Sequence, residues 1–418
     1  MNPYPWILFI LIVANAGIDI LLDAVSLGRL KGPGSKLPQE FEGVFDKEKY
    51  DKALAYQAVN NRFDMNSQLV DTPLLLAFLF LGGFNAVDMW ARAHAQNPYW
   101  AGLLFVGGLS ALKLAASLPW SIYRTFVIEQ RFGFNKTTAK TFILDLIKGI
   151  LIGGAIGAAV FSGIVYFFVR TGSKAWLYSW IAFTGVQLLL TYLAPAIFMP
   201  LFNKFKELPD GELKASIEQY NKRNLFRISG IFTMDSSRRS TKGNAFFTGF
   251  GRFKRLVLFD TLIASQSTDE LVAIFAHEVG HFKLGHIRKS IAISIASTAL
   301  MFFAFSLFIG NVDLFSAFKM QDVSVYASLV FIGFLYAPIA RIQSLFTHAL
   351  SRKAEFEADG YSAETFGKPE TLISALKKLS ADNLSNLDPH PLRVFFDYTH
   401  PPIMKRIENL RRLAAAPH

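Results

Sequence analysis

The sequence predicts an all-α, multi-pass membrane protein with seven transmembrane helices and a smaller cytoplasmic domain that carries a short β-sheet. Composition is the first indication, since 52% of the 418 residues are hydrophobic, 41 are phenylalanine and the mean hydropathy is +0.31. Such a composition is unlike that of an ordinary soluble enzyme. The other two indications are the long apolar stretches and the basic loops that separate them.

Apolar stretches of about 20 residues, the length that an α-helix needs to cross a bilayer, recur along the chain. They lie at residues 5–24, 70–89, 100–120, 146–169, 176–199, 289–311 and 323–343. Asp88 at the edge of the second stretch, and Gln187 and Pro195 in the fifth, indicate helices that face protein or a watery cavity. Spans one to five therefore fall in residues 1–202, and spans six and seven in residues 289–343.

Basic residues set the expected orientation of these spans. The connection at 26–68 is rich in lysine and arginine, whereas the next one, around 90–99, holds only Arg92. Because cytoplasmic loops collect basic residues, this alternation places the N-terminus outside and the C-terminus in the cytoplasm. The two hydrophilic segments, 203–288 and 344–418, then lie on the same side and form one domain.

The charge and the cysteine count exclude some classes of function. The formal net charge is +11, but the basic residues are spread over loops that flank membrane spans. Contact with anionic lipid headgroups explains this pattern, and we expect no nucleic-acid partner. Cysteine is absent, so a metal site must use histidine and carboxylate ligands, and a cysteine nucleophile is excluded.

The most informative motif is His277-Glu278-Val279-Gly280-His281. On a helix, residues four apart leave the same face, so both imidazoles can bind one zinc ion while Glu278 holds a water molecule. The preceding Ser267-Thr268-Asp269-Glu270 is typical of a capping box that begins a helix. The alternative is a chance pair of histidines on an amphipathic helix.

A third ligand is expected from Glu355-Phe356-Glu357-Ala358-Asp359, at the end of a long helical pattern. Glu355 and Asp359 are four apart and share a face, so one can reach the metal while the other steadies a ligating histidine. Without the histidine motif, the same stretch is also compatible with an acidic patch on a solvated helix.

Short β-prone runs precede the histidine motif at 231–235, 244–248 and 255–260. Glycine, serine and lysine separate them, which predicts a small antiparallel sheet. The residues expected at its open edge, Asn244, Ala245, Phe246 and Phe247, could pair with the main chain of an extended peptide. The alternative is that this hairpin only buttresses the fold.

A set of short motifs is spaced along the whole chain. They are Phe45–Tyr50, Leu118–Trp120, Gly133–Lys136, Asn244–Phe250, His277–His281, Leu284–His286, Ser351–Arg352, Glu355–Asp359, Asn383–Leu384, His390–Leu392 and His400–Pro402. The metal motif alone is shared by many peptidases, but the combined set resembles the integral-membrane CAAX prenyl proteases of the zinc-dependent type.

The resemblance implies a role for each site residue. His277, His281 and Glu355 would be the ligands of a single zinc ion, with Glu278 as general base and Asp359 orienting a ligating histidine. His400 and Arg406 would support the oxyanion of the transition state, and Asn244 would contact the substrate backbone. His286, five residues after His281, would point to another part of a continuous helix, so we expect a supporting, substrate-facing or structural role.

The fold implied by the resemblance is seven helices around a water-filled chamber, with the zinc domain on the cytoplasmic side. The implied reaction removes the last three residues of a prenylated CAAX protein or peptide. One alternative is a quality-control zinc protease of the related stress-response type, and another is a non-enzymatic channel or scaffold with a structural metal. The tail 414–418 has no retrieval signal, so a bacterial plasma membrane fits at least as well as the endoplasmic reticulum.

Overall fold

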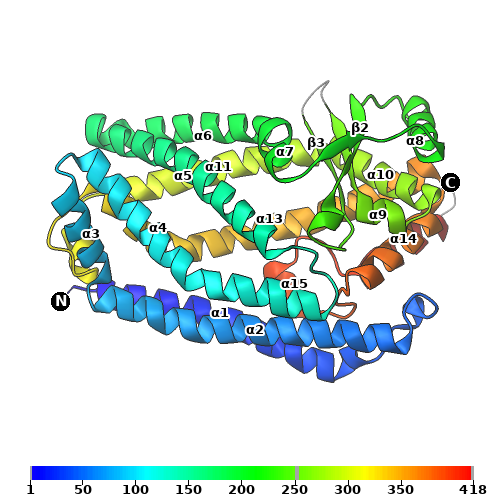
Figure 1. The fold of residues 1–418 in the computed structure, drawn as a ribbon, viewed down its shortest axis with the longest axis horizontal. Coiled ribbons are helices and arrows are strands. Elements are labelled where there is room, and N and C mark those ends of the chain that lie inside the picture. The colour runs from blue at the N-terminus through cyan, green and yellow to red at the C-terminus, as the bar shows by residue number, and fades with distance from the viewer. Residues whose placement is uncertain (1, 250–253, 416–418) are drawn as a thin grey trace.

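A computed structural model describes residues 2–249 and 254–415 of the chain (Figure 1). Phe250, part of one motif above, and residues 416–418 of the tail lie outside the described residues. The N-terminal half contains the helices α1 (Tyr4–Lys31), α2 (Lys47–Phe80), α3 (Gly83–His94), α4 (Pro98–Tyr123), α5 (Ala139–Arg170), α6 (Ala175–Leu193) and α7 (Met199–Phe202).

The C-terminal half carries the strands and the shorter helices. Its helices are α8 (Glu212–Arg223), α9 (Asp260–Ser265), α10 (Thr268–Lys283), α11 (His286–Phe308), α12 (Val312–Ala317), α13 (Val325–Phe366), α14 (Pro369–Asp382), α15 (Pro391–Asp397) and α16 (Ile403–Ala415). The strands, α8, α9, α10 and α14 gather at one end of the long molecule, opposite the N-terminus (Figure 1). The domain division near residue 202 stays a prediction.

The predicted membrane spans are confirmed as six long apolar helices, or seven when one bent pair counts as a span, within the described residues. The second stretch, 70–89, is not one straight helix. It is divided between α2 and α3, whose axes bend by 59° at the break. Gly82 at this break has φ +83°, a conformation that residues with a Cβ rarely adopt. The sequence did not predict this break within the span.

The membrane helices bury few of their side chains inside the protein. The most apolar window of α5 is 6% buried, and that of α6, extended to residue 202, is 0% buried. Large apolar side chains such as Leu151 and Leu189 are 66% and 54% exposed. In water such a surface would be unstable, whereas lipid tails supply an apolar environment.

The sheet has four strands, β1 (Phe205–Glu207), β2 (Gly230–Met234), β3 (Ala245–Thr248) and β4 (Arg255–Phe259), in the order β1-β2-β4-β3. The expected strands are present, but the sheet is mixed and not antiparallel, because β2 and β4 run parallel. β3 pairs with β4 in the antiparallel direction, on the side of β4 away from β2, so β4 lies between β2 and β3. This order leaves β3 at the edge, as predicted.

Candidate metal centre

The helix α10 carries the histidine motif and begins at the predicted capping box. The Ser267 hydroxyl accepts a hydrogen bond from the Glu270 backbone N–H, and the Glu270 carboxylate accepts one from the Ser267 N–H. Its apolar face packs on the sheet through Leu271, Phe275 and Val279, all buried. This packing fixes the rotation of α10 and turns both histidines of the motif toward α13.

A glycine lets α10 and α13 approach closely at the site. A Cβ built on Gly280 would lie 3.1 Å from the Ala358 Cα and 3.2 Å from its carbonyl oxygen. Any side chain at this position would push the two helices apart. Gly280 therefore fixes the separation between the histidines on α10 and the carboxylates on α13.

Across this contact the three predicted ligands come together. The Nε2 atoms of His277 and His281 are 3.1 Å apart. The Glu355 carboxylate lies 3.2 Å from His281 Nε2 and 3.5 Å from His277 Nε2. One ligand atom from each residue falls within 4.8 Å of the others, so a single ion can be shared by all three.

The donor set fits zinc. Two imidazole nitrogens and one carboxylate are ligands typical of a catalytic zinc site, in which water or substrate takes the fourth place. Glu355 is buried, and its Oε2 atom has no hydrogen-bond partner among the described residues. A buried carboxylate oxygen without a partner is costly unless a cation neutralises it. The Arg406 guanidinium, 3.3 Å from this oxygen, is one such cation, and a metal ion shared by the three ligands would be a second.

A carboxylate and an arginine hold the first histidine from behind. Asp359 Oδ1 lies 2.9 Å from His277 Nδ1, on the side of the ring that faces away from the ligand cluster. The Arg406 guanidinium donates two hydrogen bonds to Asp359, at 2.9 and 2.6 Å, and also lies 3.3 Å from Glu355 Oε2. Asp359 thus contacts His277 where an orienting carboxylate was expected, and Arg406 pairs with Asp359; the orienting role stays a prediction.

These contacts shift the protonation of the site. Burial opposes a charge on His277, but the hydrogen bonds with Asp359 and Glu355 raise its pKa from 6.5 to about 9. Burial also raises the pKa of Glu278 above its ordinary value, against the attraction of His277 and His281. A carboxylate with a raised pKa is a better proton acceptor for catalysis near neutral pH.

His286 does not point away from the metal histidines. Its Nδ1 lies 3.1 Å from His281 Nδ1, and its Nε2 lies 2.9 Å from Glu357 Oε2. The direction expected from the spacing was wrong because the chain is not one continuous helix here: Gly285, with φ +74°, ends the turn between α10 and α11. The supporting role expected for His286 stays a prediction. Sequence reasoning also gave Glu357 no role, although it lies within the quoted acidic motif.

His400 and Arg406 reach the site from different sides. His400 Nε2 lies 3.4 Å from Glu355 Oε1, and its side chain is 63% exposed. Arg406 is buried and already engaged with Asp359 and Glu355. The segment before His400 is held by α13, where Arg352 donates hydrogen bonds to the carbonyl oxygens of Val394 and Tyr398.

The edge strand β3 lies along the metal helix. Its Phe247 ring packs 5.6 Å from the Phe275 ring of α10. Ala245 to Thr248 pair with β4 on one side, and in the described part of the chain no strand pairs with the other side. Asn244 is exposed at the start of the strand. An open strand edge is therefore present against α10, the helix that carries His277 and His281.

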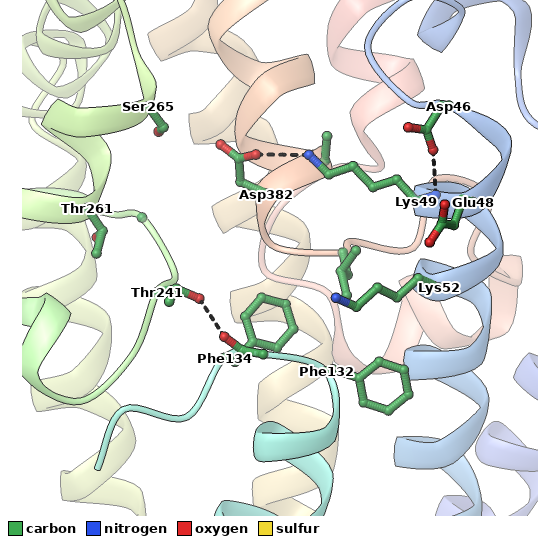
Figure 2. A pocket seen from close by; sticks show the side chains of 14 residues that line it. Asp46, Glu48, Lys49, Lys52, Phe132, Phe134, Thr241, Thr261, Ser265 and Asp382 are labelled. Carbon is green, nitrogen blue, oxygen red and sulfur yellow. Dashed lines mark hydrogen bonds and ion pairs between the residues drawn. The ribbon is translucent and has the colours of Figure 1, made fainter.

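A cavity of about 650 Å³ opens beside the start of β3, where Gly243 forms part of its wall. Figure 2 shows Lys49 and Lys52 of α2 extending into it, and Lys49 pairs with Asp382 at 3.1 Å. Among the described residues, its lining includes none of the three metal ligands. The cavity is adjacent to the edge strand and separate from the ligand cluster.

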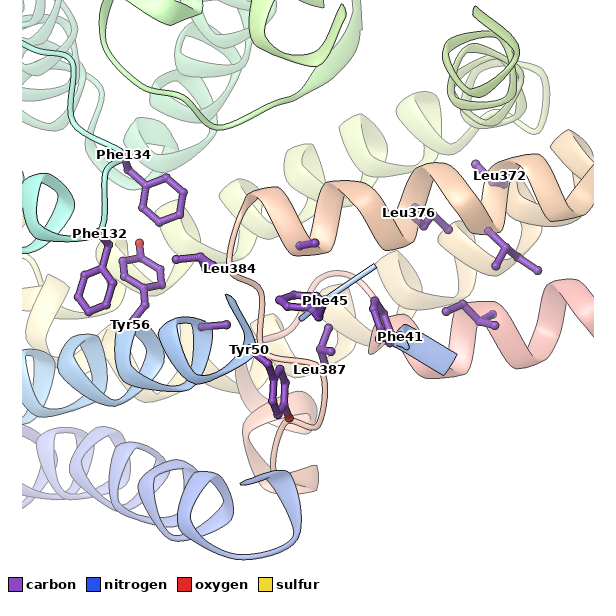
Figure 3. Packing of buried hydrophobic residues seen from close by; sticks show 14 of the residues in the cluster. Phe41, Phe45, Tyr50, Tyr56, Phe132, Phe134, Leu372, Leu376, Leu384 and Leu387 are labelled. Atoms are coloured by element: carbon purple, nitrogen blue, oxygen red, sulfur yellow. The ribbon is translucent and has the colours of Figure 1, made fainter. Parts of the chain in front are cut away.

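The wall of this cavity is backed by a core that ties the membrane helices to the metal end. Phe132, Phe134 and Leu384 belong both to the cavity lining and to this core (Figure 3). The same core contains aromatic residues of the start of α2 and apolar residues of α14 and α16. Since α16 carries Arg406, this packing also fixes the arginine behind the metal ligands.

Comparisons with known proteins agree with this geometry. The model described as "CAAX prenyl protease N-terminal, five membrane helices" matches residues 29–204, and that of peptidase family M48 matches residues 207–414. The chain is 34% identical over 398 residues to CAAX prenyl protease 1 homolog of Arabidopsis thaliana, covering 93% of each chain.

A yeast relative and a crystal structure give the same result. The chain is 33% identical over 403 residues to CAAX prenyl protease 1 of Saccharomyces cerevisiae, covering 90% of this chain and 88% of that protein. The crystal structure of S. mikatae Ste24p matches with a TM-score of 0.92 and 31% identity, covering 98% of this chain and 99% of that one. The chain belongs to peptidase family M48 and, within it, to the integral-membrane CAAX prenyl proteases, which are zinc metalloendopeptidases.

Proposed function

We propose that this protein removes the last three residues from prenylated proteins or peptides that end in Cys-a-a-X. The observation that supports this most strongly is the grouping of His277, His281 and Glu355, with the edge strand β3 packed on the helix that carries both histidines. The relatives named above are called CAAX prenyl proteases, which favours this substrate over those of a quality-control protease. The close fit of the ligands and the family membership also disfavour a structural metal in a channel or scaffold.

The residues of the site divide the chemical work. A zinc ion held by the three ligands supplies a Lewis acid for the substrate carbonyl and makes water a nucleophile at neutral pH. Glu278, on the same helix as both histidines, takes the proton of the attacking water and passes it to the nitrogen of the leaving amine. Its raised pKa suits this double role of base and then acid.

Charge that develops on the carbonyl oxygen needs a donor. His400 is exposed and lies beside Glu355, so its imidazole can reach a substrate that approaches the ligand cluster. Arg406 was expected to share this role, but its guanidinium is buried against Asp359 and Glu355. We therefore propose that Arg406 acts through these two carboxylates, as a positioning residue.

The substrate is proposed to bind as an added strand. An extended peptide can pair with the open side of β3, with the Asn244 amide available at its start. The C-terminal end of a protein is flexible enough to adopt this extended form, whereas a folded domain is not. A prenyl group on the cysteine would remain in the apolar surroundings of the membrane helices, inside the predicted chamber or in lipid.

The loop charges support an orientation with the N-terminus outside and the C-terminus in the cytoplasm. The helix α10, which carries His277 and His281, lies toward the end of the molecule opposite the N-terminus (Figure 1). With the N-terminus outside, this end faces the cytoplasm, where prenylated proteins are made. The membrane itself is proposed to be either a bacterial plasma membrane or the endoplasmic reticulum.

The decisive experiment follows the release of the terminal tripeptide from a farnesylated peptide by the purified, zinc-loaded protein. The same peptide without the farnesyl group, and the variant Glu278→Gln, are the controls. We expect the protein to release the tripeptide from the farnesylated peptide and not from the peptide without the farnesyl group. In Glu278→Gln, the rate of release should fall about 10²–10⁴-fold at unchanged zinc content. Equal cleavage of both peptides at many positions would support a quality-control protease instead.

A further inference from the structure

We infer that His286 and Glu357 form a hydrogen-bonded chain that orients His281 for metal binding, separately from the Asp359–Arg406 pair that orients His277. The inference rests on the zinc chemistry of the proposed function and adds Glu357 as a positioning residue. It concerns how tightly and in what geometry the ion is held, so it can be tested without a substrate.

The direction of each hydrogen bond follows from the metal. His281 Nε2 faces the ligand cluster, 3.2 Å from Glu355 Oε1, so it must offer a lone pair to the ion. The proton of the neutral ring is then on Nδ1, which donates to His286 Nδ1 at 3.1 Å. His286 in turn carries its proton on Nε2 and donates it to Glu357 Oε2 at 2.9 Å.

Each nitrogen in this series of hydrogen bonds is either a donor or an acceptor, and the Glu357 carboxylate determines which. A carboxylate can only accept, so it fixes the tautomer of His286, and His286 then fixes that of His281. His286 is buried, so water does not readily replace it as the acceptor for His281. Partners of this kind raise the affinity of a histidine for a metal and hold its ring in the coordinating orientation.

The turn between α10 and α11 makes the chain possible. On a continuous helix, His286 would point about 140° away from His281, since each residue turns the helix by about 100°. Gly285 has φ +74°, which starts α11 in a new direction and returns His286 to the side of His281. Glu357 meets them from α13, two residues after the ligand Glu355.

The two histidine ligands are thus supported in different ways. His277 contacts the fully buried Asp359 directly, whereas His281 reaches a carboxylate only through another imidazole. The Glu357 side chain is 38% exposed, and its second oxygen lies 3.8 Å from Lys353 Nζ. The support of His281 is therefore the more accessible of the two and can be altered without disturbing Asp359 or Arg406.

The experiment measures zinc affinity by competition with a chelator, in detergent-solubilised full-length protein. We expect Glu357→Ala to weaken zinc binding by about 10–100-fold. The variant Glu357→Gln keeps an acceptor oxygen, so it should recover most of this loss. Lys353→Ala removes only the exposed partner of Glu357 and should bind zinc like the unaltered protein.

Two further measurements separate positioning from a general structural effect. Cobalt(II) in place of zinc should show a changed visible absorption spectrum in Glu357→Ala and His286→Ala, but not in Lys353→Ala. The double variant His286→Ala/Glu357→Ala should lose no more affinity than His286→Ala alone, because both residues act through one chain. If Glu357→Ala does not purify as folded protein, His286→Ala and His286→Gln test the same chain from its other member.

Unchanged zinc affinity and cobalt spectrum in Glu357→Ala would overturn the inference, and so would additive losses in the double variant. Neither result would affect the proposed function. Conversely, unaltered protein that binds zinc fully and releases no tripeptide would overturn the proposed function alone.

Discussion

The membrane helices and the metal helix obtain their apolar surroundings from different sources. The most apolar window of the α6 segment has 0% of its residues buried inside the protein, whereas nine of the 16 residues of α10 are buried. The side chains of the α6 segment are left to the bilayer or to the predicted chamber, whereas the sheet, α13 and α14 surround those of α10. Stability at the metal end therefore depends on packing between protein groups, while the membrane helices depend on the bilayer.

The comparison predicts its largest effect at the buried arginine. In Arg406→Ala, two buried carboxylates, Asp359 and Glu355, lose the guanidinium that they share, and of the groups that the structure describes only the His277 imidazole remains beside both. We expect the free energy of unfolding to fall by about 3–5 kcal/mol in the zinc-free protein, the range seen when one partner of a buried ion pair is removed. Denaturant titration in mixed micelles measures this change.

The control for that experiment lies on the same helix. Arg412 is exposed on α16, and its guanidinium contacts only Asn409 among the described side chains. Arg412→Ala should change the free energy of unfolding by less than about 0.5 kcal/mol. Equal effects of the two variants would show that the charge of Arg406 is not needed to compensate the carboxylates.

A smaller effect is expected from a leucine on the metal helix. Leu271 is 2% exposed and packs in the core between α10 and the sheet. Leu271→Ala should lower the free energy of unfolding by about 2–5 kcal/mol, through lost burial and the cavity that remains. A loss below about 1 kcal/mol would mean that the metal end is as loosely packed as the membrane helices.

The pH dependence of zinc binding tests the electrostatics of the metal end. Asp359 and Glu355 hold the pKa of His277 at about 9, so this imidazole is protonated at neutral pH in the zinc-free protein. Zinc must displace that proton to bind. The titration of His277 alone should therefore lower the apparent zinc affinity about tenfold for each pH unit below 9. The affinity should level off above pH 9. Calorimetry in buffers of different ionisation enthalpy counts the released proton.

The smallest effect is expected on the lipid side. Leu151 on α5 is 66% exposed, so Leu151→Ala leaves no cavity inside the protein. Lipid tails can occupy the freed space, and we expect a change below about 1 kcal/mol in the free energy of unfolding. A loss as large as that of Leu271→Ala would show that Leu151 packs against protein in the membrane.

Sequence reasoning predicted the membrane part well because hydropathy is a local property of the chain. The six or seven apolar helices lie where stretches of about 20 apolar residues were found. The break at Gly82 and the parallel pairing of β2 with β4 were not predicted. Both depend on how distant segments pack, which no window of residues contains.

The site shows the same limit at a finer scale. The spacing within His277–His281 and within Glu355–Asp359 correctly indicated which groups share a helix face, and the structure brings the ligands together. Residue spacing failed for His286, because one glycine with positive φ redirects the chain after α10. It could not assign Glu357 either, since its partner comes from another helix.

The length of α13 links the ligand Glu355 mechanically to the bilayer. Its 42 residues correspond to about 63 Å of helix with Pro338 inside it, and this length is twice the ~30 Å thickness of the hydrocarbon layer. Helices answer a thicker or thinner bilayer by changing their tilt. Because α13 contacts α10 closely at Gly280 and Ala358, a change in the tilt of α13 would move Glu355 relative to His277 and His281. Acyl-chain length should therefore tune the turnover of the enzyme even when the substrate and the zinc supply stay constant.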